Sequence, residues 1–153
     1  MSAEKSRKTA GSLYILTPSV LLERKFPMKE MYALLKKAGL CFLATCEDGQ
    51  PRVRPIDSVR LYGERLYFQT GRLKAVSRQL HANPRVELCT VPDGGSWLRI
   101  EGSAVLDDDP AVRALMPETC PGCGGADEAE LWYLRKGAVT LYTPDEPPET
   151  HRF

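Results

Sequence analysis

The sequence predicts a single, mainly β domain built from antiparallel strands with a few short helices. Between residues 41 and 105, apolar or alternating runs are separated by turn residues, which is typical of strands joined in hairpins. One stretch instead carries apolar residues at helical spacing. The length of 153 residues and the 42% apolar composition suit one domain with its own core.

The first three strands are predicted from residue 41 onward. The apolar run 41–45 is followed by Asp48 and Gly49, a pair that supplies the positive φ angles of a hairpin turn. The next run, 51–61, is therefore expected to return antiparallel to the first. After a second turn, residues 65–70 form a third strand with aromatic residues at adjacent positions, so that one ring faces each side of the sheet.

A short helix follows the third strand and is expected to begin near Gly71. Leu73, Val76 and Leu80 recur at helical spacing. Pro84 ends the run because a proline restricts the residue before it. The predicted helix has roughly three turns.

The start of this helix is a candidate anion site. Its first amides have no intrahelical partner, and Lys74 lies there with Arg72 and the hydroxyl of Thr70. Arg54 shares a strand face with Arg52, because strand side chains repeat every two residues. These groups suit a terminal phosphate monoester. The alternative interpretation is a solvated helix start beside an exposed strand face, and the GxxxxGK[ST] pattern of a P-loop is absent.

Turn and capping residues define the remaining elements. Pro27 opens a helix that Gly39 stops, and Asp109 is an N-cap residue followed by proline at the first helical position. The expected helices lie at 27–38, from 109 to 116 and around 128–134, and the expected strands at 86–91, 97–105 and 137–143.

Composition excludes several classes of protein. The 21 basic and 20 acidic residues nearly cancel, so neither nucleic acid nor an anionic membrane is expected as the main partner. The apolar stretch 13–22 is too short to span a bilayer and lacks a small-residue cleavage site. We therefore expect a cytoplasmic protein.

Three segments are expected along the chain. Residues 1–26 are polar and lysine-rich at their start and form a partly disordered leader. Residues 27–143 form the folded domain. Residues 144–153 are rich in proline and acidic side chains and form an irregular tail.

Cys120 and Cys123 bracket a Pro-Gly pair, which is a tight turn that lets both sulfurs face one point. Two free thiols, a disulfide or redox pair, and a metal site all fit this spacing. A structural zinc needs four ligands, and no second CxxC exists, so no metal is predicted. The other cysteines lie on or beside predicted strands, where small buried thiols are ordinary.

Several ordered blocks resemble the pyridoxamine 5'-phosphate oxidase-like flavoproteins, the FMN-binding split-barrel family. The blocks are FLAT, DGQPRVRP, LYFQT, QLHANPRVEL and WLRIEGSAVL. The similarity covers about residues 30–142 and implies an antiparallel split β-barrel that binds FMN. The chain looks more like the shorter relatives linked to nitroimidazole reduction and resistance than like the vitamin B6 oxidase.

The resemblance implies a phosphate grip and a ring contact. Arg54 and Lys74 would hold the FMN phosphate. Arg72 would share this grip, because the oxidases carry serine and arginine where Arg72 and Leu73 stand. Thr70 would lie near the ribityl phosphate.

The ring side is implied in the same way. The backbone of Pro55 and Ile56 would lie along the isoalloxazine, with Gln69 nearby. Trp97 stands where the oxidases have a glutamine that reaches the flavin from the partner subunit. Arg99 and Glu101 share its strand face, and for them we expect a cross-strand salt bridge at a subunit contact rather than a ligand role.

The function implied is an FMN-dependent oxidoreductase acting on an unidentified small molecule, with a pyridine nucleotide as a candidate electron donor and a homodimer as the assembly. The alternative is an FMN-binding electron carrier or sensor without its own substrate. No catalytic residue is assigned, because the flavin carries the chemistry. A deazaflavin also fits, since it too presents a phosphate and a tricyclic ring, whereas haem is disfavoured because the two histidines fall at a helix end and in the tail.

Overall fold

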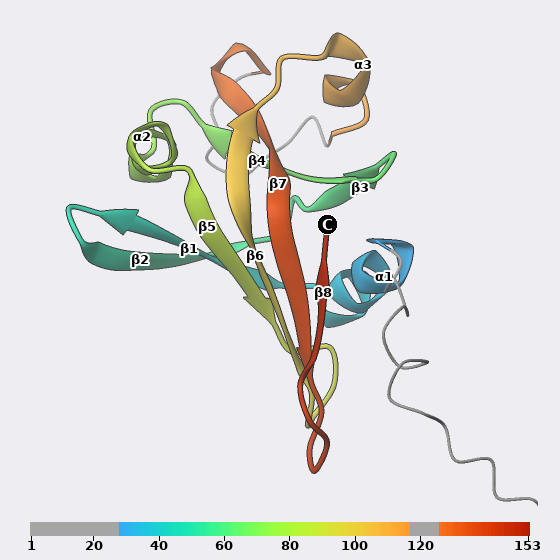
Figure 1. Cartoon of the computed structure of the whole chain (residues 1–153). Helices are drawn as coiled ribbons and strands as arrows, with labels where there is room; N and C mark the ends of the chain where they lie inside the picture. The colour runs from blue at the N-terminus through green and yellow to red at the C-terminus, as the bar shows by residue number, and fades with distance from the viewer. Residues whose placement is uncertain (1–27, 117–125) are drawn as a thin grey trace, which may run out of the picture.

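The computed structural model describes residues 28–116 and 126–153, and this part of the chain forms one antiparallel sheet with flanking helices (Figure 1). The strands are β1 Cys41–Glu47, β2 Gln50–Ile56, β3 Arg60–Tyr62, β4 Arg65–Gly71, β5 Arg85–Thr90, β6 Trp97–Leu106, β7 Ala129–Tyr142 and β8 Glu149–Arg152. The helices are α1 Met28–Ala38, α2 Ala75–Ala82, α3 Pro110–Arg113 and a 3-10 turn at Ala126–Glu128. The strand order is β2-β1-β5-β6-β7-β4-β3, with β8 paired to β7. The mainly β, antiparallel fold is therefore confirmed.

The first hairpin forms as predicted. Asp48 and Gly49 have φ angles of 51° and 80°, and β1 pairs antiparallel with β2. The expected single strand 51–61 is wrong, however, because β2 ends at Ile56 and β3 begins at Arg60. The two strands pair with different partners, β1 and β4. The residue types of a strand do not indicate which strand it pairs with, so the sequence does not show where β2 ends and β3 begins.

The prediction of a helix around 128–134 is wrong, because residues 129–134 belong to strand β7. Instead of a short helix around 128–134 followed by a strand, residues 129–142 form one strand of 14 residues. Its first half pairs with β4 on one side and β6 on the other. Pairing on both edges overrides the helical propensity of this segment, since local preference is only a weak prior.

A bulge divides β7 into two halves. The β6–β7 register shifts between Glu101 and Ser103, opposite Lys136, which adopts a left-handed φ of 51°. Gly137 next to it cannot carry a side chain, because a Cβ there would lie 2.1 Å from the Glu101 carbonyl oxygen. Beyond the bulge β7 leaves β4 and pairs with β8.

The expected irregular tail at 144–153 is wrong over its last residues. Residues 149–152 form β8, and Phe153 continues the pairing by exchanging two backbone hydrogen bonds with Gly137. Beyond the end of β4, the second half of β7 has backbone N–H and C=O groups that need another strand as partner, and β8 supplies their hydrogen bonds. The expected leader, 1–26, lies outside the described residues.

The helices agree with the capping signals more closely than with the predicted lengths. Gly39 ends α1 with a left-handed φ of 76°, while Pro27 lies outside the described residues. The Asp109 carboxylate accepts a hydrogen bond from the Ala111 amide at 2.8 Å, as an N-cap residue does. Helix α2 begins at Ala75 rather than near Gly71, because Gly71 still pairs with β7 and the chain needs residues 72–74 to turn.

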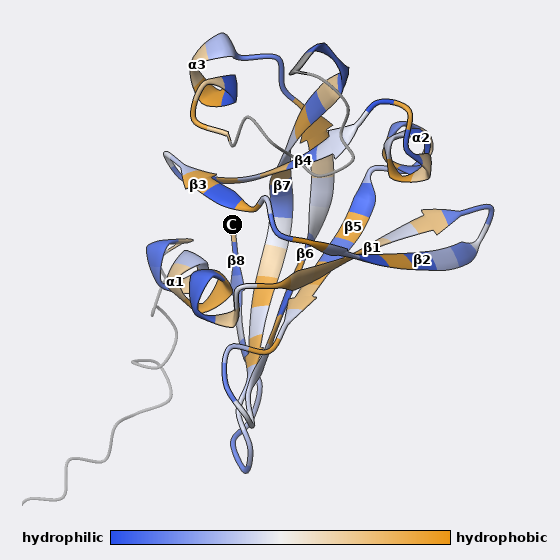
Figure 2. Cartoon of the chain, turned by 180° about the vertical axis from the view of Figure 1, so that it is seen from behind, coloured by the Kyte–Doolittle hydropathy of each residue, from blue (hydrophilic) through white to orange (hydrophobic). Residues whose placement is uncertain are grey.

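The main core lies between the sheet and helices α1 and α2. Met31, Leu80, Leu88, Leu98 and Ile100 are at most 1% exposed. Strand β2 is largely exposed and hydrophilic, as its blue colour in Figure 2 shows. Among the described residues no helix is both long and apolar enough to cross a membrane.

Candidate functional site at helix α2

Arg54 joins the first hairpin to helix α2. Its Nη1 donates a hydrogen bond of 2.6 Å to the hydroxyl of Thr45 on β1, and its Nη2 donates one of 2.7 Å to Oε1 of Gln79 on α2. The Thr45 hydroxyl donates to the same Gln79 oxygen at 2.6 Å. Gln79 is 4% exposed and Thr45 is equally buried, so the guanidinium is held in one orientation.

Arg54 has donors that make no hydrogen bond within the described residues and that suit an anion. Partial burial lowers the pKa of its guanidinium from the ordinary value, but an arginine keeps its charge. Within the described part of the chain, Nε of Arg54 has no acceptor at hydrogen-bonding distance. Neighbouring Arg52 instead pairs with Glu47 at 3.0 Å on the exposed face. Arg54 is therefore partly buried and fixed by several contacts, whereas Arg52 lies exposed and, in the part of the chain that the structure describes, is held only through its Nε.

The start of α2 supplies a second cationic element. Lys74 is the N-cap residue, with an extended backbone and no side-chain capping bond, and its amide bonds to the Gly71 carbonyl. Among the described residues no side chain is seen to cap the first amides of α2, and such amides favour an anion. Arg72 lies in the preceding turn, where its side chain is 66% exposed.

A buried carboxylate, Glu130 of β7, holds α2 to the sheet. It is 6% exposed. It accepts a 2.7 Å hydrogen bond from the Ser77 hydroxyl, lies 3.1 Å from Nε2 of His81 and lies 4.0 Å from Nε of Arg72. Burial alone would raise the pKa of Glu130, but the His81 and Ser77 contacts outweigh it and hold the pKa below its ordinary value. Glu130 is thus ionised at neutral pH.

Four other predicted residues lie on the two strands beside this cluster. Gln69 and Thr70 of β4 are buried at 7% and 4% exposure, and Thr70 pairs directly with Glu130. Oε1 of Gln69 has no hydrogen-bond partner among the described residues, although buried polar atoms are normally paired. Pro55 and Ile56 follow Arg54 at the end of β2, where Pro55 is exposed and Ile56 partly buried.

Trp97 lies on β6, which is three strands from β2 in the sheet. It begins β6, whereas the Leu106 end of β6 pairs with β7 beside Glu130. Nine residues of strand separate these ends, about 30 Å at 3.3 Å per residue. Trp97 stacks on Tyr142 with ring centroids 4.6 Å apart.

The expected cross-strand salt bridge is confirmed for Arg99, whose partner is Glu87 on β5, whereas Glu101 has no ion pair among the described residues. Glu87 raises the pKa of the Arg99 guanidinium further, and the Tyr142 hydroxyl adds a 3.2 Å contact. The structure therefore gives Arg99 a structural partner on β5. Whether this face forms a subunit contact stays a prediction.

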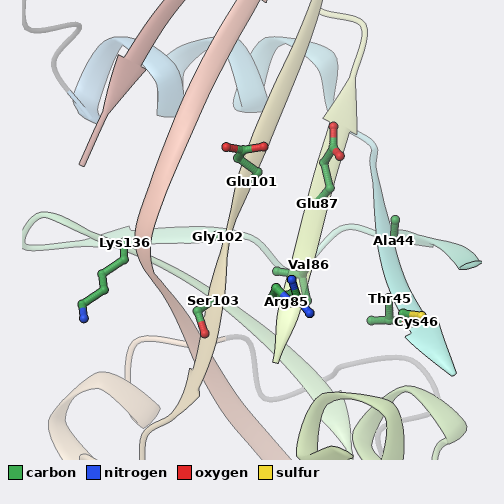
Figure 3. A pocket seen from close by; sticks show the side chains of 10 residues that line it. All are labelled: Ala44, Thr45, Cys46, Arg85, Val86, Glu87, Glu101, Gly102, Ser103 and Lys136. Atoms are coloured by element: carbon green, nitrogen blue, oxygen red, sulfur yellow. The ribbon is translucent and has the colours of Figure 1, made fainter. Parts of the chain in front are cut away.

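A surface pocket of about 560 Å³ adjoins the Arg54 cluster through Thr45 (Figure 3). It lies across β1, β5 and β6, and its charged lining residues include Arg85, Glu87, Glu101 and Lys136. None of the residues predicted to bind the cofactor lines this pocket or the three others found in the described part of the chain.

Sequence reasoning missed the residues that fix α2 in place: Thr45, Ser77, Gln79, His81 and Glu130. Ser77 and His81 carry a usable signal, because residues four apart share one helix face. Cys120 and Cys123 lie outside the described residues. In the described part, no group of three or more histidine, cysteine or acidic side chains is arranged to hold a metal ion.

Comparisons with known proteins identify the family of this chain. A family model described as pyridoxamine 5'-phosphate oxidase matches residues 27–120, which is more than half of the 153-residue chain. A search of the curated proteins finds no match.

Three solved structures are similar over most of their length. A NimC/NimA family protein from Clostridium acetobutylicum shares 29% identity with a TM-score of 0.72, over 83% of this chain and 92% of that one. A pyridoxamine 5'-phosphate oxidase-related, FMN binding protein from Nostoc punctiforme shares 15% identity with a TM-score of 0.55, over 82% and 95%. A structure named F420 reductase shares 24% identity with a TM-score of 0.55, over 70% and 93%. The predicted antiparallel split barrel is thereby confirmed.

Proposed function

From the premise that the chain belongs to the pyridoxamine 5'-phosphate oxidase family, we propose that it is a flavin-binding protein that acts as an oxidoreductase on a small molecule. The observation that carries this proposal is the position of Arg54. Its guanidinium is fixed by Thr45 and by Gln79, the fifth residue of α2, and its Nε has no acceptor among the described residues. A cation fixed to a helix whose N-cap residue makes no side-chain capping bond is suited to a phosphate.

The phosphate end of the cofactor would be held within one chain. Arg54 and Lys74 supply the charges, and the first amides of α2 supply directed donors. Arg72 adds a third cation, because its side chain is 66% exposed and lies 4.0 Å from Glu130, at the outer limit of an ion pair. Thr70, in the strand that leads into this turn, completes the set.

The ring end fits Gln69, Pro55 and Ile56. The unpaired Oε1 of Gln69 can accept a hydrogen bond from a flavin. Trp97 would join this site from a second copy of the chain, because in its own chain it stacks on Tyr142 on a strand that is three strands from β2. We therefore propose a homodimer.

When bound, the flavin supplies hydride or electron transfer, and the protein supplies binding, orientation and electrostatics. We propose FMN as the cofactor, in line with the FMN-binding neighbour. The F420 reductase neighbour favours a deazaflavin as the second candidate. The absorption spectrum of the purified protein, and the mass of the small molecule that denaturation releases, distinguish these two cofactors.

The test of the site is the double substitution Arg54→Ala/Lys74→Ala. Loss of two charge-assisted contacts, about 1.5–3 kcal/mol each, is expected to weaken flavin binding by about a hundredfold or more. The matched control, Arg52→Ala/Lys37→Ala, removes the same charge from exposed positions and is expected to retain flavin.

Arg54 also has a structural role, so folding must be checked by circular dichroism. Lys74→Ala alone keeps the Arg54 bridge and is expected to weaken flavin binding by at least tenfold. Equal flavin retention by the double variant and the control would refute the site.

The oxidoreductase and the electron carrier are separated by turnover. We propose a reduced pyridine nucleotide as the electron donor, and its oxidation is measured with a nitroaromatic compound as the acceptor. A nitroaromatic acceptor is chosen because the sequence resembles relatives linked to nitroimidazole reduction and because a NimC/NimA family protein shares 29% identity with the chain. Saturable turnover supports the enzyme. Redox cycling of bound flavin without a saturable acceptor supports the carrier or sensor.

A further inference from the structure

A second cavity, of about 650 Å³, lies on the other side of the molecule from α2. It is bounded by the start of α1, the turn between β3 and β4, the bulge of β7 and the end of β8. Figures 1 and 2 both show α1, β3 and β8 around this region and α2 on the opposite side. We call it the α1–β8 pocket. Its volume is in the range of pockets that hold one small organic molecule.

The lining of the α1–β8 pocket is strongly cationic. Its basic residues are Lys29, Arg65, Arg135, Lys136 and Arg152. Glu64 is the one acidic side chain in the lining. Arg65 lies 3.9 Å from Asp107, whereas the other four cations have no ion pair within residues 28–116 and 126–153. Cations gathered on one concave surface raise its potential and attract an anion.

One wall of the pocket is apolar and aromatic. Leu134 is buried, and the rings of Tyr133 and Phe153 also line the cavity. The Arg65 guanidinium lies 4.5 Å from the Tyr133 ring centroid, which fixes a cation at the rim of this wall. An anion with an apolar or aromatic body would therefore find both a charge partner and a surface to cover.

The backbone holds this wall in place. Phe153 exchanges hydrogen bonds of 3.2 and 3.1 Å with Gly137, and its ring lies so close that a Cβ on Gly137 would be 2.6 Å from Cζ. The left-handed Lys136 beside it belongs to the bulge of β7, and bulges often re-aim side chains next to binding sites.

Helix α1 adds a further positive element. Its 11 residues begin with Met28 and Lys29, which both line the pocket. The N-terminal end of a helix carries a partial positive charge, so the helix and the cationic side chains favour the same sign of ligand.

We propose that the α1–β8 pocket binds a small organic anion with an aromatic or apolar body, such as an aromatic sulfonate, phosphate ester or carboxylate. The site shares no residue with the phosphate grip at Arg54 and Lys74, and therefore does not rest on the proposed function.

The test is a calorimetric titration of the purified, full-length protein with anilinonaphthalene sulfonate. Lys29→Gln/Arg152→Gln removes two exposed cations, one from α1 and one from β8, that have no ion pair among the described residues. We expect its affinity for the probe to fall at least tenfold, which corresponds to about 1.4 kcal/mol. The control Lys36→Gln/Lys37→Gln makes the same charge change at the other end of α1 and is expected to bind like the unmodified protein.

Two further measurements define the chemistry. The same ring system without the sulfonate is expected to bind at least tenfold more weakly. Binding of the sulfonate should also weaken with salt, because the Debye length falls from about 10 Å at 0.1 M to about 3 Å at 1 M. Equal affinity of the two double variants, or equal affinity for the charged and neutral probes, would overturn the proposal. Flavin retention is expected to be unchanged in both variants, so this outcome is separate from that of the α2 site.

Discussion

Replacing Glu130 with alanine is expected to destabilise the protein by about 3 kcal/mol. The carboxylate accepts hydrogen bonds from Ser77 and His81. Ser77 is 2% exposed, so its hydroxyl would lose a charged partner with no water to replace it, at a cost of about 1–3 kcal/mol. The cavity left by the deleted side chain adds to this cost. His81 is half exposed and can rehydrate, so it contributes less.

For a domain of this size, about 3 kcal/mol lowers the Tm by about 6–12 °C. Thermal unfolding followed by circular dichroism measures this shift. Ser77→Ala/Glu130→Gln is the matched control, because it removes the Ser77 hydroxyl donor together with the Glu130 charge and leaves no unpaired hydroxyl. Its Tm should therefore fall less than that of Glu130→Ala. A Tm within 1 °C of the unmodified protein would refute a role for Glu130 in anchoring α2.

The pH dependence of this contribution has a definite sign. The pKa of Glu130 is lowered in the folded protein, so the unfolded chain binds its proton more readily. The stabilisation is therefore fully present above the ordinary glutamate pKa of about 4.3 and is lost as the pH falls through the lower folded pKa. The difference in unfolding free energy between the unmodified protein and Glu130→Gln should shrink as the pH falls below about 4.

Two further predictions follow from the sheet. Gly137→Ala is expected to lower the free energy of unfolding in urea by about 3 kcal/mol, since its Cβ would lie 2.1 Å from the Glu101 carbonyl oxygen. Gly102→Ala, whose nearest contact would be 3.5 Å, should lower it far less. Equal losses of stability in the two variants would contradict this. Cys41 is 3% exposed and burial raises the pKa of its thiol, so iodoacetamide should modify partly exposed Cys46 well before Cys41 in the native protein, as peptide masses would show. Equal rates would argue against a buried Cys41.

The parts of the fold that sequence predicts are those with a local cause. Asp48 and Gly49 set the first hairpin by their own φ preferences, and Gly39 and Asp109 mark helix ends by capping. The errors concern residues whose state depends on a distant strand. Residues 129–135 form a strand because β4 and β6 lie on either side of them, and the tail forms β8 because β7 has an unpaired edge.

The candidate site divides in the same way. Arg54 and Lys74 could be named from the sequence, through a family resemblance and the position of the helix start. Glu130 could not, because it fell in a segment expected to be helical, where nothing placed it beside Ser77. Gln79 was hidden for a different reason: its role is to fix Arg54, and no local pattern marks a residue that orients another.

The proposed contact of Trp97 with the flavin ring has a consequence for flavin binding. Arg54 and Glu130 both contact α2, and Lys74 is the N-cap residue of that helix, so we expect a single chain to hold the phosphate end. Trp97 lies on β6, stacked on Tyr142 and 42% exposed. If Trp97 meets the ring, it does so in a second copy, and flavin affinity must then rise with protein concentration until the dimer is complete. An affinity that stays constant across a dilution series through the monomer range would assign the whole site to a single chain.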